Sequence, residues 1–188
     1  MDPDVPLVVP DVNGHALKDF AKKRIIATPN CSTTQMVQVL APLHRKATVE
    51  RVVVCTYQAV SGAGRGGIDE LEVQVRDMFN LREPKVETFD QRIAFNALPR
   101  IPAKDPIPAD GTTGEERKMI EETKKILAAP HMRIGATCVR VPVFNAHSEA
   151  VHVELGRALS IEEARAAIAE EPNVLVVDDI KLGLYPTA

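Results

Sequence analysis

A single cysteine stands at the predicted start of a helix, in the run PNCSTT at residues 29–34. Small hydroxyl and amide residues are typical of helix N-caps, and apolar residues then recur at helical spacing as far as Leu43. Unpaired backbone N–H groups and the positive end of the helix dipole favour an anion there, and they lower cysteine pKa values to about 3.5–7.5. The setting therefore indicates a nucleophilic thiolate at Cys31. The alternative is a small, inert cysteine of the core.

Arg140 and His147 flank the run VPVFNA at residues 141–146. Their odd separation puts the two side chains on opposite faces of a straight strand. Both reach one pocket only if the chain turns near Asn145 and Ala146, which these residue types permit. An imidazole at such a turn is accessible, and its ordinary pKa suits proton transfer near neutrality. A solvated histidine without a function is the alternative for His147.

The run GAGRGG at residues 62–67 matches GxGxxG between a predicted strand and a predicted helix. A dinucleotide-binding loop also has an acidic residue about 20 positions on, where this chain offers Glu83 or Glu87. However, Gln58 is polar where such a fold needs an apolar core strand, and both acidic residues stand in a polar stretch. We therefore expect a loop that lines a site beside Cys31. A tight glycine turn remains the structural alternative.

The elements that position these residues alternate between helix and strand. Helices are predicted over residues 31–44, 68–79 and 115–128, and a fourth starts at Ser160, where Glu163 completes a capping box. Strands are predicted over residues 51–60, 139–143, 151–155 and 173–177, and the run 93–95 also favours a strand. Glu115 and Lys118 are neighbours on one helix face, where a weak surface ion pair is the alternative to a function. This alternation predicts an α/β or α+β fold.

Composition excludes several classes of protein. The 188 residues are 45% apolar and 26% charged, which is ordinary for a soluble domain. The net charge of −3 without a basic run does not suggest a nucleic-acid partner, and the apolar runs are too short to span a membrane. The three cysteines form no CxxC and the histidines no HxxxH, and the N-terminus is acidic where a signal peptide is basic. We therefore expect free thiols, no metal site and a cytoplasmic location.

Five ordered blocks over almost the whole chain resemble the aspartate-semialdehyde dehydrogenase family. They are TPNCST at 28–33, TYQAVSGAG at 56–64, IAFN at 93–96, EERKM at 115–119, and ATCVRVPV at 136–143 with AHSE at 146–149. The CSTT element is also similar to that of glyceraldehyde-3-phosphate dehydrogenase. The resemblance implies an α+β catalytic and dimerisation domain, with helices packed on a mixed sheet.

The resemblance also implies a reaction, the NADPH-dependent reductive dephosphorylation of aspartyl 4-phosphate to aspartate 4-semialdehyde. This oxidoreductase step belongs to the biosynthesis of lysine, by way of diaminopimelate, and of threonine and methionine. Cys31 would be the nucleophile that forms a thioester. Gln58 would orient the bound intermediate, and His147 would be the general acid/base for the proton of the oxygen.

The same resemblance implies the binding residues. Arg140 would clamp the substrate carboxylate, a bidentate task that lysine performs less well. Glu115 would hold the amino group, and Lys118 and Asn30 would help to bind the phosphate. The nicotinamide would lie near a loop formed by Ser61, Gly62, Ala63 and Gly64.

The resemblance further implies that residues 1–29 are a remnant of an N-terminal nucleotide-binding domain. Residues 30–188 would be the catalytic and dimerisation domain without its closing segment, so NADP would lack its main binding domain. We therefore expect the chain alone to turn over negligibly. Its expected partners are a small-molecule substrate, phosphate and further copies of itself in a homodimer or tetramer. Alternatives are an N-acetyl-glutamyl-phosphate reductase, a cysteine hydrolase using Cys31 and His147, and a non-catalytic dimerising chain.

Overall fold

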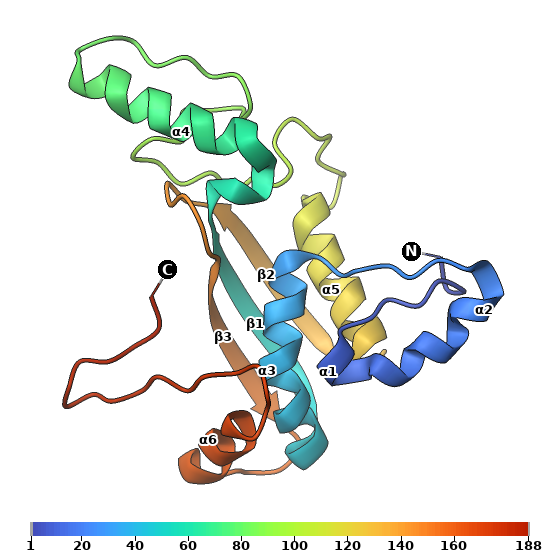
Figure 1. Cartoon of the computed structure of the whole chain (residues 1–188). Helices are drawn as coiled ribbons and strands as arrows, with labels where there is room; N and C mark the ends of the chain where they lie inside the picture. Colours follow the sequence, from blue (N-terminus) through green and yellow to red (C-terminus); the bar gives the residue numbers. More distant parts are fainter. Residues whose placement is uncertain (1, 188) are drawn as a thin grey trace. The chain divides into compact units, whose positions relative to one another are not determined.

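The computed structural model describes residues 2–187, which form two compact units. Unit 1 comprises residues 2–53, 118–135 and 151–186, and unit 2 comprises residues 54–117, 136–150 and 187. The helices are α1 (Pro10–Asn13), α2 (Phe20–Lys23), α3 (Cys31–Ala47), α4 (Gly64–Phe79), α5 (Gly114–Ile126) and α6 (Ile161–Ala169), with 3-10 helices η1 (Gly14–Asp19) and η2 (Val60–Ala63) (Figure 1).

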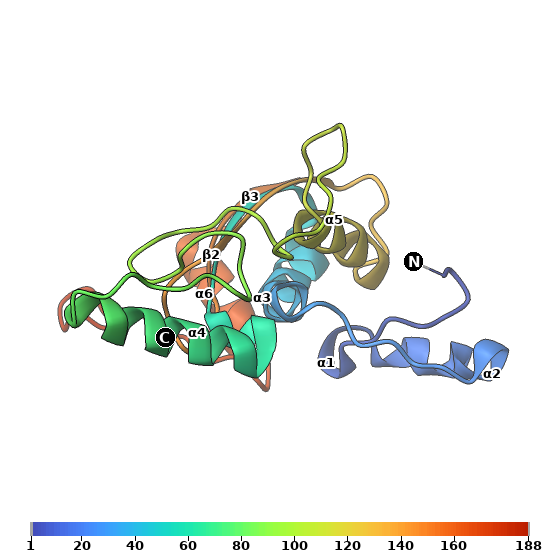
Figure 2. The same ribbon diagram turned by 90° about the horizontal axis from the view of Figure 1, so that it is seen from above.

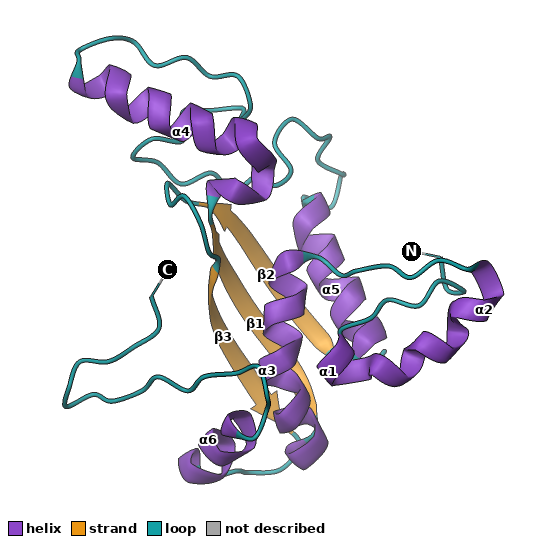
Figure 3. Cartoon of the chain, viewed as in Figure 1, coloured by secondary structure: helices purple, strands orange, loops and turns teal. Residues whose placement is uncertain are grey.

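Three strands form one sheet in the order β2-β1-β3, namely β1 (Val49–Gln58), β2 (Arg133–Arg140) and β3 (Ser148–Leu155) (Figure 3). The carbonyl of Gln58, which ends β1, accepts from the N–H of Val141 just after β2 at 2.9 Å, so these two strands run parallel. Arg51 near the start of β1 pairs with Glu154 near the end of β3, so this pair is antiparallel. The sheet is therefore mixed, and the expected α+β class is confirmed.

In unit 1, α3 begins at Cys31 because the Asn30 side chain caps it. Oδ1 of Asn30 accepts from the N–H groups of Ser32 at 3.0 Å and Thr33 at 3.2 Å, which satisfies two orphan donors of the first turn. The apolar face of the helix is buried, and Val37 on it joins a small core cluster with Leu7, Val9 and Ile126. The predicted helix over 31–44 is thereby confirmed. The capping box of Ser160 and Glu163 on α6 is confirmed as well.

In unit 2, the segment after α4 runs back along that helix, as two views show (Figures 1 and 2). Helix α4 contributes Leu71 to a core cluster that this segment completes, with the buried residues Val60, Phe89, Ile93, Ala94 and Leu98. The predicted helix over 68–79 is therefore confirmed, although Phe79 at its end is 78% exposed.

Three predicted strands differ from the structure. Residues 173–177 form no strand, because none of the described strands lies beside them and Leu175 remains 84% exposed. Residues 93–95 enter a turn, in which Phe95 has a φ of 55°. The strand predicted over 139–143 ends at Arg140 and begins at Arg133, since residues 141–147 form a loop. A β-rich composition makes a strand only where a neighbour pairs with its backbone.

None of the helices in residues 2–187 combines the length and the apolar composition that a membrane-spanning helix requires. The helices present an apolar face to a core and a polar face to solvent, as α3 and α4 do.

Candidate active site

The backbone of Ala59, directly after β1, holds two of the predicted side chains of unit 2. Its N–H donates to Nδ1 of His147 at 3.0 Å, and its carbonyl accepts from Nη1 of Arg140 at 2.7 Å. Arg140 is only 6% exposed, and Ala146 turns the chain with a φ of 67°. The turn predicted between Arg140 and His147 is therefore confirmed. It brings both side chains to the end of β1.

Gly62 lies directly against the same two side chains. A β-carbon at this position would be 2.7 Å from Nη1 of Arg140 and 3.3 Å from both Cε1 and Nε2 of His147. Real β-carbons do not approach other atoms to 2.7 Å, so a side chain at this position would require the guanidinium end of Arg140 to shift. The loop is fixed by hydrogen bonds from the N–H of Val60 to the carbonyl of Val143 (2.9 Å) and from Ser61 to Phe144 (3.1 Å). The expected loop at residues 61–64 is helical instead, since residues 61–63 belong to η2 and Gly64 begins α4, and Gly62 in η2 lies against the Arg140 and His147 side chains.

Gln58 and Glu115 form a buried polar pair in unit 2. Nε2 of Gln58 donates to Oε1 of Glu115 at 3.1 Å, and the two residues are 1% and 5% exposed. Oε1 of Gln58 is buried and accepts no hydrogen bond from residues 2–187. A buried acceptor without a donor costs about 1–3 kcal/mol. An N–H or O–H group of a bound ligand at this oxygen is therefore stabilised.

The surroundings of His147 lower its pKa below the ordinary 6.5. Partial burial disfavours the charged imidazolium most, and the positive charge of Arg140 adds to this effect. The backbone carbonyl of Ala146 and the charge of Glu115 act in the opposite direction and do not outweigh the first two. The imidazole is therefore mainly neutral at pH 7, the state in which it exchanges protons with a substrate oxygen.

Cys138 is a second thiol of unit 2, and its environment suppresses reactivity. The residue is buried, and desolvation raises the pKa of its thiol to about 12. Its backbone N–H donates to Oε1 of Glu116 at 3.2 Å, which ties β2 to the start of α5. A protonated, buried thiol is a poor nucleophile, so Cys138 has a structural function.

The remaining predicted residues belong to unit 1. Cys31 is exposed in the first turn of α3, and no disulfide engages its thiol. The backbone N–H of Asn30 donates to Oε2 of Glu122 on α5 at 2.7 Å, which fixes the residue that caps α3. Lys118 is exposed on α5. The structure thus brings together Gln58, Ser61–Gly64, Glu115, Arg140 and His147 in unit 2, and it places Asn30, Cys31 and Lys118 in unit 1.

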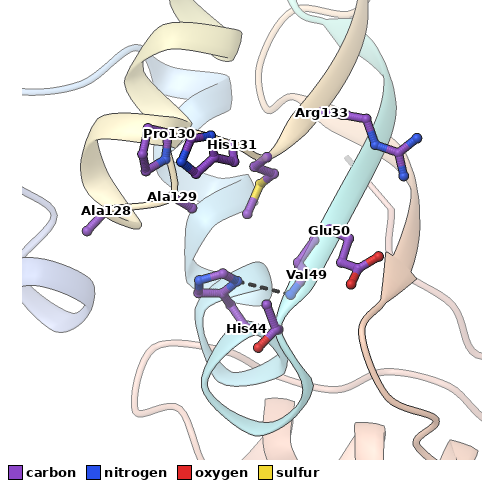
Figure 4. Close-up of a pocket in the computed structure, with 10 residues that line it drawn as sticks. His44, Val49, Glu50, Ala128, Ala129, Pro130, His131 and Arg133 are labelled. Atoms are coloured by element: carbon purple, nitrogen blue, oxygen red, sulfur yellow. Dashed lines mark hydrogen bonds between the residues drawn. The ribbon is translucent and has the colours of Figure 1, made fainter.

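A cavity of about 470 Å³ lies elsewhere in unit 1, and none of the predicted site residues lines it (Figure 4). Its walls come from the ends of α3 and α5 and from the starts of β1 and β2. His44 of α3 in this wall is held by the start of β1, because its Nδ1 accepts from the N–H of Val49 at 3.0 Å. Within residues 2–187, no group of three or more His, Cys, Asp and Glu side chains is arranged to hold a metal ion.

Sequence reasoning missed two contributors to this arrangement. Ala59 acts through its backbone, and its side chain gives no signal in the sequence. Gln74 does give one, because it interrupts the apolar face of α4 that contains Leu71, Val75 and Met78. A polar residue on such a face predicts a buried hydrogen-bonding partner.

Comparisons with known proteins agree on the type of domain. Residues 40–188 match the family described as semialdehyde dehydrogenase, dimerisation domain. The aspartate-semialdehyde dehydrogenase of Aquifex aeolicus is 51% identical over 99% of this chain and 54% of its own length. That of Legionella pneumophila is 47% identical over 98% of this chain and 52% of its own length. The chain thus spans about half the length of these relatives.

Solved structures show the same fold. The aspartate semialdehyde dehydrogenase II of Vibrio cholerae, complexed with ASA, superposes with a TM-score of 0.88 at 45% identity, over 91% of this chain and 50% of that one. The Candida albicans enzyme, solved with NADP, gives a TM-score of 0.61 at 28% identity, over 89% of this chain and 45% of that one.

Proposed function

This chain belongs to the semialdehyde dehydrogenase family, and we propose that it carries the catalytic and dimerisation residues of an aspartate-semialdehyde dehydrogenase. The proposed reaction is the reductive dephosphorylation of aspartyl 4-phosphate to aspartate 4-semialdehyde. Its product feeds the biosynthesis of lysine, threonine and methionine. The roles of individual residues, the cofactor and the substrate are all part of this proposal.

One observation carries the proposal. Arg140 and His147 converge on the backbone of Ala59 and Gly62 at the end of β1. A fixed guanidinium beside a neutral imidazole suits a substrate that combines a carboxylate with an oxygen that gains or loses a proton. Gln58 ends the same strand and presents a buried acceptor that has no partner among residues 2–187.

Cys31 is the proposed nucleophile, because its thiol is exposed in the first turn of α3 whereas Cys138 is buried and protonated. The thiolate attacks the acyl carbon of aspartyl phosphate and forms a C–S bond. The C–O bond to the phosphate breaks, and inorganic phosphate leaves with the electron pair. In the reverse direction the thiolate adds to the aldehyde carbon, and the aldehyde oxygen takes up a proton.

We assign the proton of that oxygen to His147. Because its Nδ1 accepts from the N–H of Ala59, Nε2 carries the proton of the neutral imidazole and can donate it to the oxygen. Arg140 binds the α-carboxylate of the substrate, and the Gln58–Glu115 pair receives its ammonium group. Lys118 and Asn30 are proposed to bind the phosphate.

NADP is the proposed cofactor, and residues 61–64, in η2 and at the start of α4, suit the approach of a flat ring. Gly62 and Gly64 are exposed and have no side chains, and a β-carbon at Gly64 would meet no atom within 4 Å. Ser61, Gly62, Ala63 and Gly64 would hold the nicotinamide end. When bound, the cofactor supplies or accepts the hydride that interconverts the thioester and aldehyde levels of oxidation.

Acyl transfer to the chain tests the proposal. The chain is incubated with aspartyl phosphate, and intact-mass and peptide mass spectrometry locate the added aspartyl group. We expect one group, on Cys31, with release of phosphate; Cys31→Ser abolishes it, and Cys138→Ala retains it. Transfer from N-acetyl-glutamyl phosphate instead, or steady hydrolysis of simple acyl esters without phosphate release, contradicts the proposal in favour of another enzyme.

Turnover and association are tested separately. Reduction of NADP by the chain with aspartate semialdehyde and phosphate measures the complete reaction.

A second copy of this chain is the proposed partner, in keeping with the dimerisation domain that it matches. Sedimentation equilibrium over a range of concentrations measures that association, and a monomer throughout contradicts it.

A further inference from the structure

Gln74 uses every hydrogen-bonding position of its side-chain amide inside unit 2. Its Oε1 accepts from the backbone N–H groups of Ile93 and Ala94, both at 3.0 Å. Its Nε2 donates to Oε1 of Glu70 at 2.9 Å and to the carbonyl of Lys85 at 2.7 Å. The residue is 0% exposed. A buried amide has two acceptor and two donor positions, so nothing is left unsatisfied.

Glu70, one turn earlier on α4, extends this network. Its Oε1 accepts from Gln74, and its Oε2 accepts from the N–H of Thr88. The two side chains therefore hold the segment at residues 85–94 against the helix at three places. This segment has no regular secondary structure of its own, so these bonds replace the ladder that a strand would have used.

The segment leads directly to Arg140. Four residues after Ala94, Leu98 pairs with Arg140 as an isolated antiparallel bridge. The N–H of Leu98 donates to the carbonyl of Arg140 at 2.9 Å, and the N–H of Arg140 donates to the carbonyl of Leu98 at 2.8 Å. Ile93 and Leu98 both lie in the core cluster with Leu71, so the segment between them is packed at both ends.

We propose that Gln74 is a positioning residue for Arg140, acting through the segment at residues 93–98. Gln74 fixes the backbone at Ile93 and Ala94, and the bridge from Leu98 sets the position from which the Arg140 guanidinium reaches Ala59. The inference rests on the proposed function in one respect, namely that Arg140 binds the carboxylate of the substrate. Gln74 itself touches neither substrate nor cofactor in this scheme.

Two variants of Gln74 separate its contributions. Gln74→Leu keeps the volume but leaves two N–H groups, one carbonyl and one carboxylate oxygen without this partner. Gln74→Glu keeps an acceptor for Ile93 and Ala94 but loses both donors, to Glu70 and to Lys85, and it places a second carboxylate beside that of Glu70. Leu71→Ala is the matched control, because it weakens the same core cluster without touching these hydrogen bonds. Glu72→Leu is the control on the exposed face of α4.

Hydrogen exchange of individual amides tests the coupling without any catalytic assay. In the full chain with Gln74→Leu, we expect the Ile93, Leu98 and Arg140 amides to exchange at least about 10-fold faster relative to the amides of β1. In Gln74→Glu we expect the Thr88 amide to be accelerated more than those of Ile93 and Ala94, whose acceptor is kept, and Leu71→Ala accelerates all these amides together. Equal acceleration of β1 and of residues 93–98 in Gln74→Leu overturns the proposal.

Kinetics then test the consequence for the substrate. Gln74→Leu is expected to raise the aspartyl phosphate concentration that gives half the maximal rate of acyl transfer to Cys31 about 10-fold, with the maximal rate within about twofold, because Arg140 contributes binding. A fall in the maximal rate at an unchanged half-saturating concentration overturns the proposal. If the unmodified chain neither forms the acyl group nor turns over, the proposed function fails, and the exchange experiment still decides the coupling of Gln74 to Arg140.

Discussion

Gly62 and Arg140 are in such close contact that a β-carbon on Gly62 would lie 2.7 Å from Nη1 of the guanidinium. Gly62 is exposed, so solvent reaches the loop on its other side. The carbonyl of Ala59 holds the same Nη1 at 2.7 Å. The guanidinium is thus confined between a carbonyl and a glycine, and its direction is set before any substrate binds. This pre-organisation is what a carboxylate-binding arginine requires.

The first prediction concerns Gly62→Ala, which inserts a methyl group into that contact. We expect the rate of acyl transfer from aspartyl phosphate to Cys31 to fall about 100-fold, because a displacement of about 1 Å in a positioning group has effects of this size. The free energy of unfolding should fall by about 1–3 kcal/mol, because the methyl group overpacks against the buried Arg140 side chain. Gly14→Ala is the control, because its β-carbon meets no atom within 4 Å. An unchanged rate in Gly62→Ala would show that the Arg140 guanidinium moves aside without loss of function.

The second prediction concerns the pH dependence of stability through His147. Its pKa is lower in the folded chain than the ordinary 6.5, so the unfolded chain takes up the proton first as the pH falls. The free energy of unfolding therefore decreases below about pH 6.5 and is unaffected above it. His147→Gln should remove this part of the slope. Urea titrations of both proteins at several pH values between 5 and 8 measure it, and identical slopes contradict the prediction.

The third prediction assigns part of that pKa shift to Arg140. Arg140→Gln removes a positive charge from the imidazole, so the pKa of His147 should rise toward its ordinary value. Burial, the Ala146 carbonyl and Glu115 remain, so part of the shift persists. An NMR titration of the His147 ring protons measures the midpoint in both proteins. Arg65→Gln, at an exposed position, is the matched control, and a fall of the midpoint in Arg140→Gln refutes the assignment.

The fourth prediction concerns the reactivity of the thiols. Cys31 is exposed, whereas Cys138 is buried with a pKa of about 12 and stays almost entirely protonated at pH 8. Iodoacetamide at this pH should therefore modify Cys31 first, and Cys138 only after unfolding. Peptide mass spectrometry over a time course in buffer and in urea measures both rates. Early labelling of Cys138 in buffer would mean that unit 2 opens readily.

The fifth prediction concerns the cap of α3. Asn30→Ala removes the acceptor for the N–H groups of Ser32 and Thr33 and should lower the free energy of unfolding by about 1 kcal/mol. Asn30→Asp retains an acceptor and should lose far less. Urea denaturation monitored by circular dichroism compares the three proteins. Equal stability of Asn30→Ala and the unmodified chain would show that the cap contributes nothing.

Local patterns in the sequence were sufficient for several elements. The cap at Asn30, the apolar period of α3 and α4 and the capping box at Ser160 all depend on residues within a few positions of one another. Such interactions are encoded by spacing alone, so the helices could be predicted. The turn between Arg140 and His147 could also be predicted, because their odd separation requires one if both side chains are to reach one pocket, and Asn145 and Ala146 permit it.

Pairing between distant segments could not be predicted in this way. Residues 173–177 have the composition of a strand, yet no described strand lies beside them, and only tertiary structure decides which runs find a neighbour. The hydrogen bonds of the Ala59 backbone join it to Arg140 and His147, which are 81 and 88 positions away in the sequence.

The sequence by itself thus determined which residue types are present and which helices present them. The blocks around Cys31, Gln58, Arg140 and His147 were sufficient to indicate the family. Tertiary structure decided that Arg140 is buried and directed at the carbonyl of Ala59, that His147 is mainly neutral at pH 7, and that Gln74 is buried and bonded to Ile93 and Ala94. The physical reason is that burial and charge proximity arise only when distant segments pack together, and these two effects set both orientation and pKa.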